Sequence, residues 1–161
     1  MRLTYSRDGR FLAIGFGKTG GIRVYRTSDY FVAGEDGNYG DWIYGVDFDL
    51  EGRLVTVSAD GFTRLYGSDF KLITKKKAPE SFRPASVRFS PDGSNIAVTF
   101  YDLPLLSTKL EVLSGKDLSN QYSPDTRGLA KGMLRPVSWS LDGKFLYAGK
   151  GSRAPYVVRK W

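Results

Sequence analysis

Hydrophobic and polar residues alternate along four stretches of the chain, and these stretches align with one another without gaps. Each has an aliphatic, a polar and an aromatic residue, then an acidic residue followed by glycine, then a second alternating run. They read "LTYSRDGRFLAI", "VDFDLEGRLVTV", "VRFSPDGSNIAV" and "VSWSLDGKFLYA". They begin at Leu3, Val46, Val87 and Val137, at spacings of 43, 41 and 50 residues. This regular recurrence indicates a repeat protein.

Alternation with a period of two predicts β-strands, so each stretch is expected to form a hairpin. Glycine adopts a positive φ without penalty and aspartate bonds to nearby backbone, which favours a tight turn at the acidic-glycine pair. We expect four columns of apolar side chains to share one buried face of each hairpin. The columns are Leu3, Val46, Val87, Val137; Tyr5, Phe48, Phe89, Trp139; Leu12, Val55, Ile96, Leu146; and Ile14, Val57, Val98, Ala148.

Further strands are predicted after each hairpin. A third strand is expected at 21–26, 61–67, 108–114 and 156–161, and a weaker fourth at 30–34 and 70–75. The corresponding place after Asp117 is poorly patterned. No window keeps a period of 3.6 residues, so helix is expected to be nearly absent.

The stretch "GKTGG" at 17–21 invites comparison with a phosphate-binding loop. That loop needs G-x-x-x-x-G-K-[ST] between a strand and a helix. Here Leu12 occupies the place of the leading glycine, and a strand pattern follows. Without a helix N-terminus there is nothing to hold a phosphate, so we interpret the stretch as a turn.

The units of about 41–43 residues, with "FSPDG" at 89–93 and "FLAIG" at 11–15, resemble the WD-repeat family of β-propellers. The resemblance covers essentially the whole chain. It implies an all-β fold of four consecutive four-stranded antiparallel blades, the last lacking its outer strand, within a larger ring or an oligomeric ring. The blades are expected at approximately 1–35, 43–76, 84–122 and 134–161.

The chain departs from the family pattern in its polar residues. The Trp-Asp pair that ends the family's third strand is replaced by Tyr25-Arg26, Tyr66-Gly67, Leu113-Ser114 and the terminal Trp161. The chain has no histidine, so the family's Asp-His-Ser/Thr-Trp network cannot form. Asp60 stands where the aspartate of that network would lie, without its usual partner. We therefore expect a degenerate member held mainly by apolar columns and strand hydrogen bonds.

Four such units raise the question of ring closure, because propellers typically have about four to eight blades. Three explanations stay open: a fragment of a longer propeller, two chains forming an eight-bladed ring about a two-fold axis, or a closed four-bladed ring. With open blade faces, the polypeptide alone is expected to self-associate or to bind missing blades of the same protein.

Composition narrows the chemistry. The chain has 161 residues with neither cysteine nor histidine, which excludes disulfides, thiolate or imidazole metal sites and Ser-His-Asp triads. No apolar run approaches the roughly 18–20 residues of a membrane-spanning helix. The N-terminus lacks the apolar core of a signal peptide. We expect a soluble, cytoplasmic protein with no cofactor and no membrane contact.

Net charge is +7 and is unevenly distributed. Residues 1–50 carry six basic and seven acidic side chains, whereas residues 101–161 carry ten against five. An anionic partner would therefore meet the later part of the chain. An ordinary solubilising surface charge explains the same numbers.

In the family that the chain resembles, partners bind the face formed by loops from strand four to the next strand one and by loops between strands two and three. Those loops here gather Trp, Tyr and Arg, the types enriched at binding hot spots. The candidate partner-binding residues are Trp42, Tyr44, Arg83, Tyr101, Arg135 and Arg153. Trp42 and Tyr44 could instead fill grooves between blades. The insertion at 101–108 offers two leucines that look exposed, for a missing neighbour or a partner.

Two charged clusters have simpler explanations. Asp47, Asp49 and Glu51 alternate, so three carboxylates could hold Ca²⁺, but they follow the outward face of a strand and its turn. We predict no metal site there. Lysines 75–77 lie on an expected outer strand, where lysine prevents unwanted strand pairing; a phosphate-binding patch is the alternative.

The function favoured by the sequence is a non-catalytic scaffold for protein–protein interaction, presenting its loop face to a protein or peptide. The alternative is an electrostatic binder of nucleic acid or of a phosphorylated ligand through the basic C-terminal half. A propeller enzyme using carboxylates or tyrosine has no supporting motif. We expect no enzyme and no catalytic residues.

Overall fold

The computed structural model describes residues 1–102, 107–127, 134–150 and 157–161, which form fifteen strands and one short 3-10 helix. Sheet 1 comprises β1 Arg2–Tyr5, β2 Phe11–Gly15, β3 Ile22–Arg26 and β4 Val32–Asp36. Sheet 2 comprises β5 Ile43–Phe48, β6 Leu54–Ser58, β7 Phe62–Tyr66 and β8 Leu72–Lys77. Sheet 3 comprises β9 Arg83–Phe89, β10 Asn95–Asp102, β11 Ser107–Ser114 and β12 Asn120–Tyr122. Sheet 4 comprises β13 Leu134–Trp139, β14 Leu146–Lys150 and β15 Val157–Lys160.

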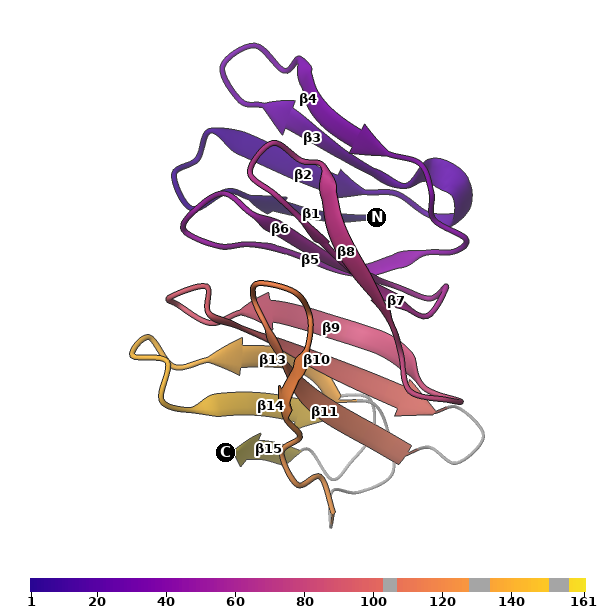
Figure 1. The fold of residues 1–161 in the computed structure, drawn as a ribbon, viewed down its shortest axis with the longest axis vertical. Coiled ribbons are helices and arrows are strands. Elements are labelled where there is room, and N and C mark those ends of the chain that lie inside the picture. The colour runs from indigo at the N-terminus through magenta and orange to yellow at the C-terminus, as the bar shows by residue number, and fades with distance from the viewer. Residues whose placement is uncertain (103–106, 128–133, 151–156) are drawn as a thin grey trace.

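Sheets 1 and 2 form the upper half of the molecule as drawn, and sheets 3 and 4 form the lower half, where they overlap in this view (Figure 1). Strands within each sheet are antiparallel and run in chain order. The first strands of successive sheets lie against each other, β1 on β5, β5 on β9 and β9 on β13. The prediction of three four-stranded sheets and a three-stranded last sheet is therefore confirmed.

The "GKTGG" stretch contains the one helical element in the described part of the chain, the 3-10 turn η1 Lys18–Gly20. It connects β2 to β3, and the residue that follows it, Gly21, has a φ of 62°. A Cβ at that position would lie 2.0 Å from the Asp36 carbonyl oxygen, so glycine is required there. The stretch is a turn between two strands.

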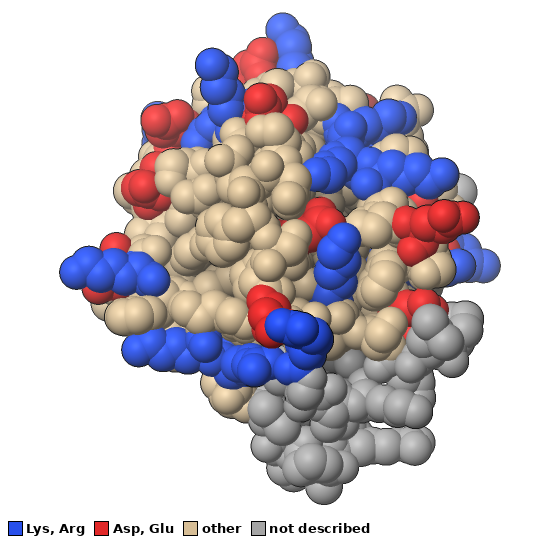
Figure 2. All heavy atoms as spheres, turned by 60° about the horizontal axis from the view of Figure 1, so that its bottom comes forward, with Lys and Arg blue, Asp and Glu red and all other residues tan. Residues whose placement is uncertain are grey.

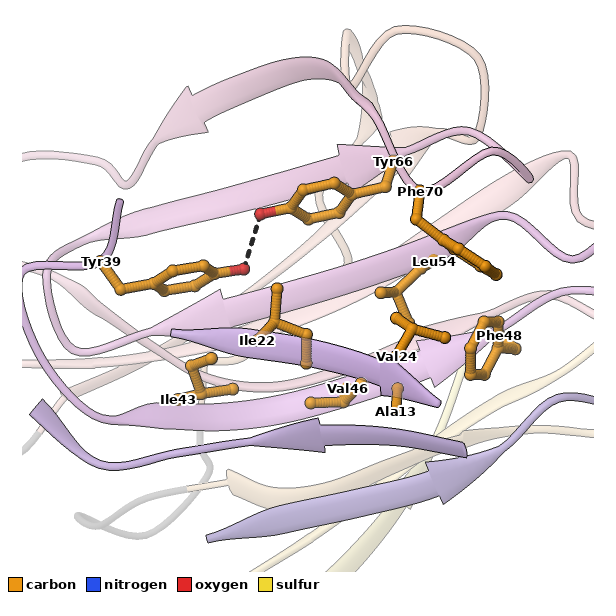
Figure 3. Close-up of a cluster of buried hydrophobic side chains, with 10 residues drawn as sticks. All are labelled: Ala13, Ile22, Val24, Tyr39, Ile43, Val46, Phe48, Leu54, Tyr66 and Phe70. Atoms are coloured by element: carbon orange, nitrogen blue, oxygen red, sulfur yellow. Dashed lines mark hydrogen bonds between the residues drawn. The ribbon is translucent and has the colours of Figure 1, made fainter. Parts of the chain in front are cut away.

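Three apolar clusters fill the spaces between successive sheets. Between sheets 1 and 2, side chains of β2 and β3 meet side chains of β5, β6 and β7 (Figure 3). At this contact a Cβ on Gly15 would lie 2.8 Å from Ile43 Cγ2, and at the next one a Cβ on Gly45 would lie 3.0 Å from Val87 Cγ1. Both glycines thus allow close approach of neighbouring sheets.

The expectation that all four columns share one face is wrong for sheet 2. In sheet 3 Phe89 lies opposite Ile96, and sheets 1 and 4 have the same register, so their columns share a face. In sheet 2 Phe48 lies opposite Leu54, which is one residue before the column residue Val55. Val55 and Val57 consequently face sheet 3, whereas Val46 and Phe48 face sheet 1.

The turn chemistry explains this shift. In sheet 3 the Ser90 hydroxyl donates to Asp92 and accepts from the Asn95 amide, five residues on, at 2.9 Å. The same pattern occurs at Ser6 and Ser140. In sheet 2 an aspartate replaces this serine, and its carboxylate accepts from the Arg53 amide four residues on, at 2.8 Å. The hairpin therefore closes one residue earlier.

The column face of sheet 1 corrects a second expectation. Leu3 is 57% exposed and Tyr5 is 56% exposed, whereas Phe48 and Phe89 at the equivalent aromatic position are buried. In sheets 3 and 4 this face is covered by the preceding sheet. No described segment covers it in sheet 1, so alternation identified the face correctly but not its burial.

Asp60 lacks a histidine partner, as expected from the sequence, and pairs with an arginine instead. Its carboxylate lies 2.7 Å from Arg64 Nη2 and also accepts the Ser58 hydroxyl and the Gly40 amide. The Arg64 guanidinium is buried, donates to the Asn38 carbonyl at 2.8 Å and lies 4.0 Å from the Tyr39 ring centroid. A buried ion pair thus joins the turn between β6 and β7 to β7 itself.

A chain of hydroxyl groups extends this polar network between sheets 1 and 2. The Tyr39 hydroxyl lies 2.8 Å from the Tyr66 hydroxyl (Figure 3). It also lies 2.6 Å from Thr56 Oγ1, and the Tyr66 hydroxyl donates to Asp36 Oδ2 at 2.8 Å. Burial raises the pKa of Tyr39 to about 12. Apolar columns and strand hydrogen bonds are therefore supplemented by buried polar groups in this part of the fold.

Candidate binding face

One end of the inner strands carries most of the predicted partner-binding residues. Tyr44 lies near the start of β5, Arg83 begins β9, Tyr101 lies near the end of β10 and Arg135 lies near the start of β13. We call this end of the sheets the loop face. Since the first strands pack side by side, residues far apart in the sequence meet there.

Four of the predicted residues come together in one cluster. The Arg135 guanidinium lies 4.8 Å from the Tyr44 ring centroid and 5.7 Å from the Tyr101 ring centroid. Arg83 lies directly opposite Tyr101 across β9 and β10. Sheets 2, 3 and 4 thus each contribute to one aromatic and cationic cluster.

The electrostatics of the cluster affect Tyr101. Burial raises the pKa of the Tyr101 hydroxyl, and the neighbouring Tyr44 raises it further, while Arg135 and Arg83 act in the opposite direction. Tyr101 therefore stays a neutral phenol at physiological pH. Tyr101 is only 6% exposed, so it packs behind Tyr44 and Arg135 and offers little surface of its own.

Trp42 lies at the same end but apart from this cluster. Its ring packs on the loop between β2 and β3, where a Cβ on Gly17 would lie 2.5 Å from the ring atom Cζ3. It is still 44% exposed, and its carbonyl accepts the Ala59 amide at 2.8 Å. Trp42 thus both fills a groove between sheets and presents an indole surface.

Two hollows open at the loop face. One, of about 300 Å³, lies where the four inner strands meet and is lined by Arg2, Leu3, Tyr44, Gly45, Val46, Ala85, Ser86, Arg88, Arg135 and Pro136. We call it the inner-strand hollow. The other, of about 360 Å³, lies beside the segment 77–83. Both are small compared with typical ligand pockets.

Sequence reasoning missed two residues of the inner-strand hollow, Arg2 and Arg88. They lie on β1 and β9 at positions that alternate with the apolar columns. Alternation places such residues on the opposite side of a strand, which is the available signal, but it does not indicate that arginines of different repeats meet.

The carboxylates of 47–51 do not gather at one point. Asp49 forms an ion pair with Arg53 at 2.6 Å, and Asp47 Oδ2 accepts the Phe89 amide at 2.9 Å. Glu51 is exposed. Burial raises the pKa of Asp47, against the opposing effect of Arg88. Within the described ranges no group of three potential metal ligands occurs.

The remaining predicted residues are placed as follows. Arg153 and the leucines of 103–106 lie outside the described residues. Lysines 75–77 belong to β8, the outer strand of sheet 2, where Lys75 Nζ lies 4.9 Å from the Phe62 ring centroid and Lys76 Nζ lies 3.9 Å from Glu111 Oε2. In the part of the chain that the structure covers, no helix is long and apolar enough to cross a membrane.

Searches against family models and against curated proteins give no match. Solved structures do match: a chain of Kuenenia stuttgartiensis hydrazine synthase aligns over 98% of this chain with a TM-score of 0.80 and 20% identity. A chain of a mitotic checkpoint complex aligns over 93% with a TM-score of 0.76 and 14% identity. The four sheets are the blades of a β-propeller.

At these identities the similarity concerns the propeller fold alone. The aligned region spans 44% of the length of each of the two matching chains. The propeller arrangement explains why the inner strands of all four sheets converge and why their starting ends share one face.

Proposed function

We propose that this propeller is a non-catalytic protein–protein interaction module, a degenerate member of the WD-repeat family that presents its loop face to a protein or peptide. The observation that carries the proposal is the cluster of Tyr44, Tyr101, Arg83 and Arg135, built from three sheets. Tyr44, Arg83 and Arg135 are at least partly exposed and are held on a rigid scaffold with the buried Tyr101 behind them. Such preorganised aromatic and arginine side chains provide contact area at low entropic cost. One matching chain belongs to a mitotic checkpoint complex, which agrees with such a role.

The test is selection of peptides from a displayed random library on the purified 161-residue chain. Selected peptides are remeasured by fluorescence anisotropy on variants Trp42→Ala and Arg83→Gln. We expect each variant to weaken binding about ten-fold, because hot-spot side chains typically cost more than about 1 kcal/mol when truncated. Leu50→Ala is the control, since Leu50 is exposed on a turn at the opposite end of β5. Equal binding by all variants would contradict the proposal.

Binding of nucleic acid or a phosphorylated ligand through the basic half is the second candidate, supported by the excess of basic residues in 101–161. Figure 2 shows Lys and Arg on the face turned forward in two main groups, one along the lower left edge and one at the upper right, with Asp and Glu between them. Affinity for single-stranded oligonucleotides that falls steeply between low and physiological salt would favour this candidate. Salt-insensitive peptide binding would favour the first.

A further inference from the structure

We propose that the inner-strand hollow binds a single acidic side chain, that of a glutamate, from the peptide partner. This inference rests on the proposed function and adds a chemical specificity to it. Its basis is the convergence of three arginines, Arg2, Arg88 and Arg135, on one hollow whose lining contains no acidic residue.

The arginines of the hollow differ from most others in the described part of the chain. On outer strands and turns, arginines form ion pairs with nearby carboxylates, as Arg23 does with Glu35 and Arg26 with Asp29. Among described residues, Arg2, Arg88 and Arg135 have no carboxylate oxygen within the 4.0 Å that defines those pairs. Positive charge at the hollow is therefore uncompensated at short range.

Each of the three guanidinium groups is oriented by a contact that leaves donors free. Arg2 Nε donates to the Tyr44 carbonyl at 3.1 Å, and Arg88 Nη1 donates to the Val87 carbonyl at 2.8 Å. Arg135 stacks on Tyr44, and its Nε is buried with no acceptor among the described residues. Hydrogen bonds from guanidinium groups to a ligand carboxylate are charge-assisted and stronger than neutral ones, so the hollow favours an anionic group.

The dimensions of the hollow favour one side chain. Its volume of about 300 Å³ lies at the lower end of ligand pockets. Tyr44 and Pro136 supply apolar surface for methylene groups, and the arginines supply the donors for a carboxylate. A flexible acidic side chain with apolar methylenes suits this combination.

Asp47 is the nearest competitor for Arg88. It lies on the same inner strand as Tyr44 and lines a neighbouring hollow together with Arg7 and Arg88. Its Oδ2 atom is already occupied by the Phe89 amide. One carboxylate thus balances Arg7 and Arg88 in part, and Arg2 and Arg135 keep their full charge for a ligand.

The test uses nuclear magnetic resonance of the arginine Nε–H groups in the complete chain. The probes are the acetylated, amidated peptide Ala-Gly-Glu-Gly-Ala, its glutamine counterpart and inorganic phosphate. We expect the glutamate peptide alone to shift the Arg135 signal saturably. Its affinity should fall about ten-fold or more in Arg135→Gln and Arg2→Gln, since a charge-assisted hydrogen bond is lost.

Arg26→Gln is the matched control, because Arg26 lies on β3 in an exposed ion pair away from the hollow. The affinity of this variant for the glutamate peptide should equal that of the unmodified chain. The comparison between glutamate and glutamine peptides on the unmodified chain needs no variant, so a folding defect cannot obscure the result. No saturable shift, equal binding of the glutamine peptide, or tighter binding of phosphate would overturn the inference. Library peptides that lose affinity in Trp42→Ala and in Arg83→Gln, together with no binding of the glutamate pentapeptide, would leave the proposed function intact and reject the acidic specificity.

Discussion

The same aromatic column of the repeat has different surroundings in different sheets. Phe89 is 2% exposed and lies in the cluster between sheets 2 and 3, whereas Tyr5 at the equivalent position is largely exposed. Trp139 is partly buried, and its indole donates to the Arg88 carbonyl at 3.3 Å. The contribution of this column to stability therefore depends on whether a neighbouring sheet covers it.

This difference predicts unequal costs of truncation. Phe89→Ala should lower the free energy of unfolding by about 3–5 kcal/mol, because a large buried side chain leaves a cavity. Tyr5→Ala should cost within about 0.5 kcal/mol, as exposed substitutions do. Urea unfolding followed by circular dichroism measures both. Similar costs at the two positions would contradict the difference in burial described for sheets 1 and 3.

The Asp60–Arg64 pair gives a second prediction at the residue scale. Arg64→Met should lower the free energy of unfolding by about 3 kcal/mol or more, because the carboxylate is left without its partner in a largely buried place. The double variant Asp60→Leu/Arg64→Met should be less destabilised than the single one, since no isolated charge remains. Urea unfolding of Arg64→Met, Asp60→Leu and the double variant measures this. If the double variant loses as much free energy of unfolding as the two single variants together, the pair is not coupled.

At the scale of elements, the serine-aspartate turn is the unit that sets hairpin register. Asp8, Asp92 and Asp142 each accept a serine hydroxyl two residues before them, and this hydrogen bond is the main cause that lowers the pKa of each carboxyl. A carboxyl whose pKa is lower in the folded than in the unfolded protein stabilises the fold only while it is ionised.

Acid should therefore destabilise these turns. The stabilisation is fully present above the unfolded pKa of about 3.9 and is lost as pH falls through the lowered folded values. Replacing Ser6, Ser90 and Ser140 together by Ala should flatten this dependence between about pH 4 and pH 2. Urea unfolding of the unmodified chain and the triple variant at several pH values measures this pH dependence. The buried Asp47 is present in both proteins, so its titration does not affect the comparison. An unchanged slope would contradict the role of the serine hydroxyls.

The hairpins and third strands could be predicted from alternation because a strand with one buried face needs apolar residues at every second position. The register of sheet 2 could not be predicted, because it depends on one turn residue. Asp49 accepts a hydrogen bond from the amide four residues later in the chain, whereas the serines of the other turns accept from the amide five residues later. The Asp60–Arg64 pair was missed because the family pattern directs attention to histidine. The meeting of Tyr44, Tyr101, Arg83 and Arg135 involves separations that only the packing of sheets determines.

At the scale of the whole molecule, sheet 1 presents an apolar face that no described segment covers. Leu3 and Tyr5 occupy it, and the equivalent face of sheets 3 and 4 packs against the preceding sheet. Large exposed apolar surfaces favour association. The face is thus suited to contact with a further blade, in this protein or in a second copy.

We expect the 161-residue chain to self-associate through this face. Leu3→Lys/Tyr5→Lys should shift the population toward monomer in analytical ultracentrifugation, because desolvating two charges opposes the contact. Leu141→Lys is the control, since Leu141 is exposed on a turn. A chain that is monomeric at all concentrations, or association that the double variant leaves unaltered, would contradict this expectation.

The early closure of the sheet 2 hairpin has a further consequence for how the units relate to one another. It rotates β6 so that Thr56, rather than a valine, meets the Tyr39 hydroxyl. In the third unit the place that Thr56 holds opposite Val46 belongs to Val98, opposite Val87, and valine has no hydroxyl. Exchanging the second unit for a duplicate of the third would deprive Tyr39 of that hydrogen-bond partner. The repeats are therefore specific to their neighbours, and their order in the chain cannot be changed without loss of contacts.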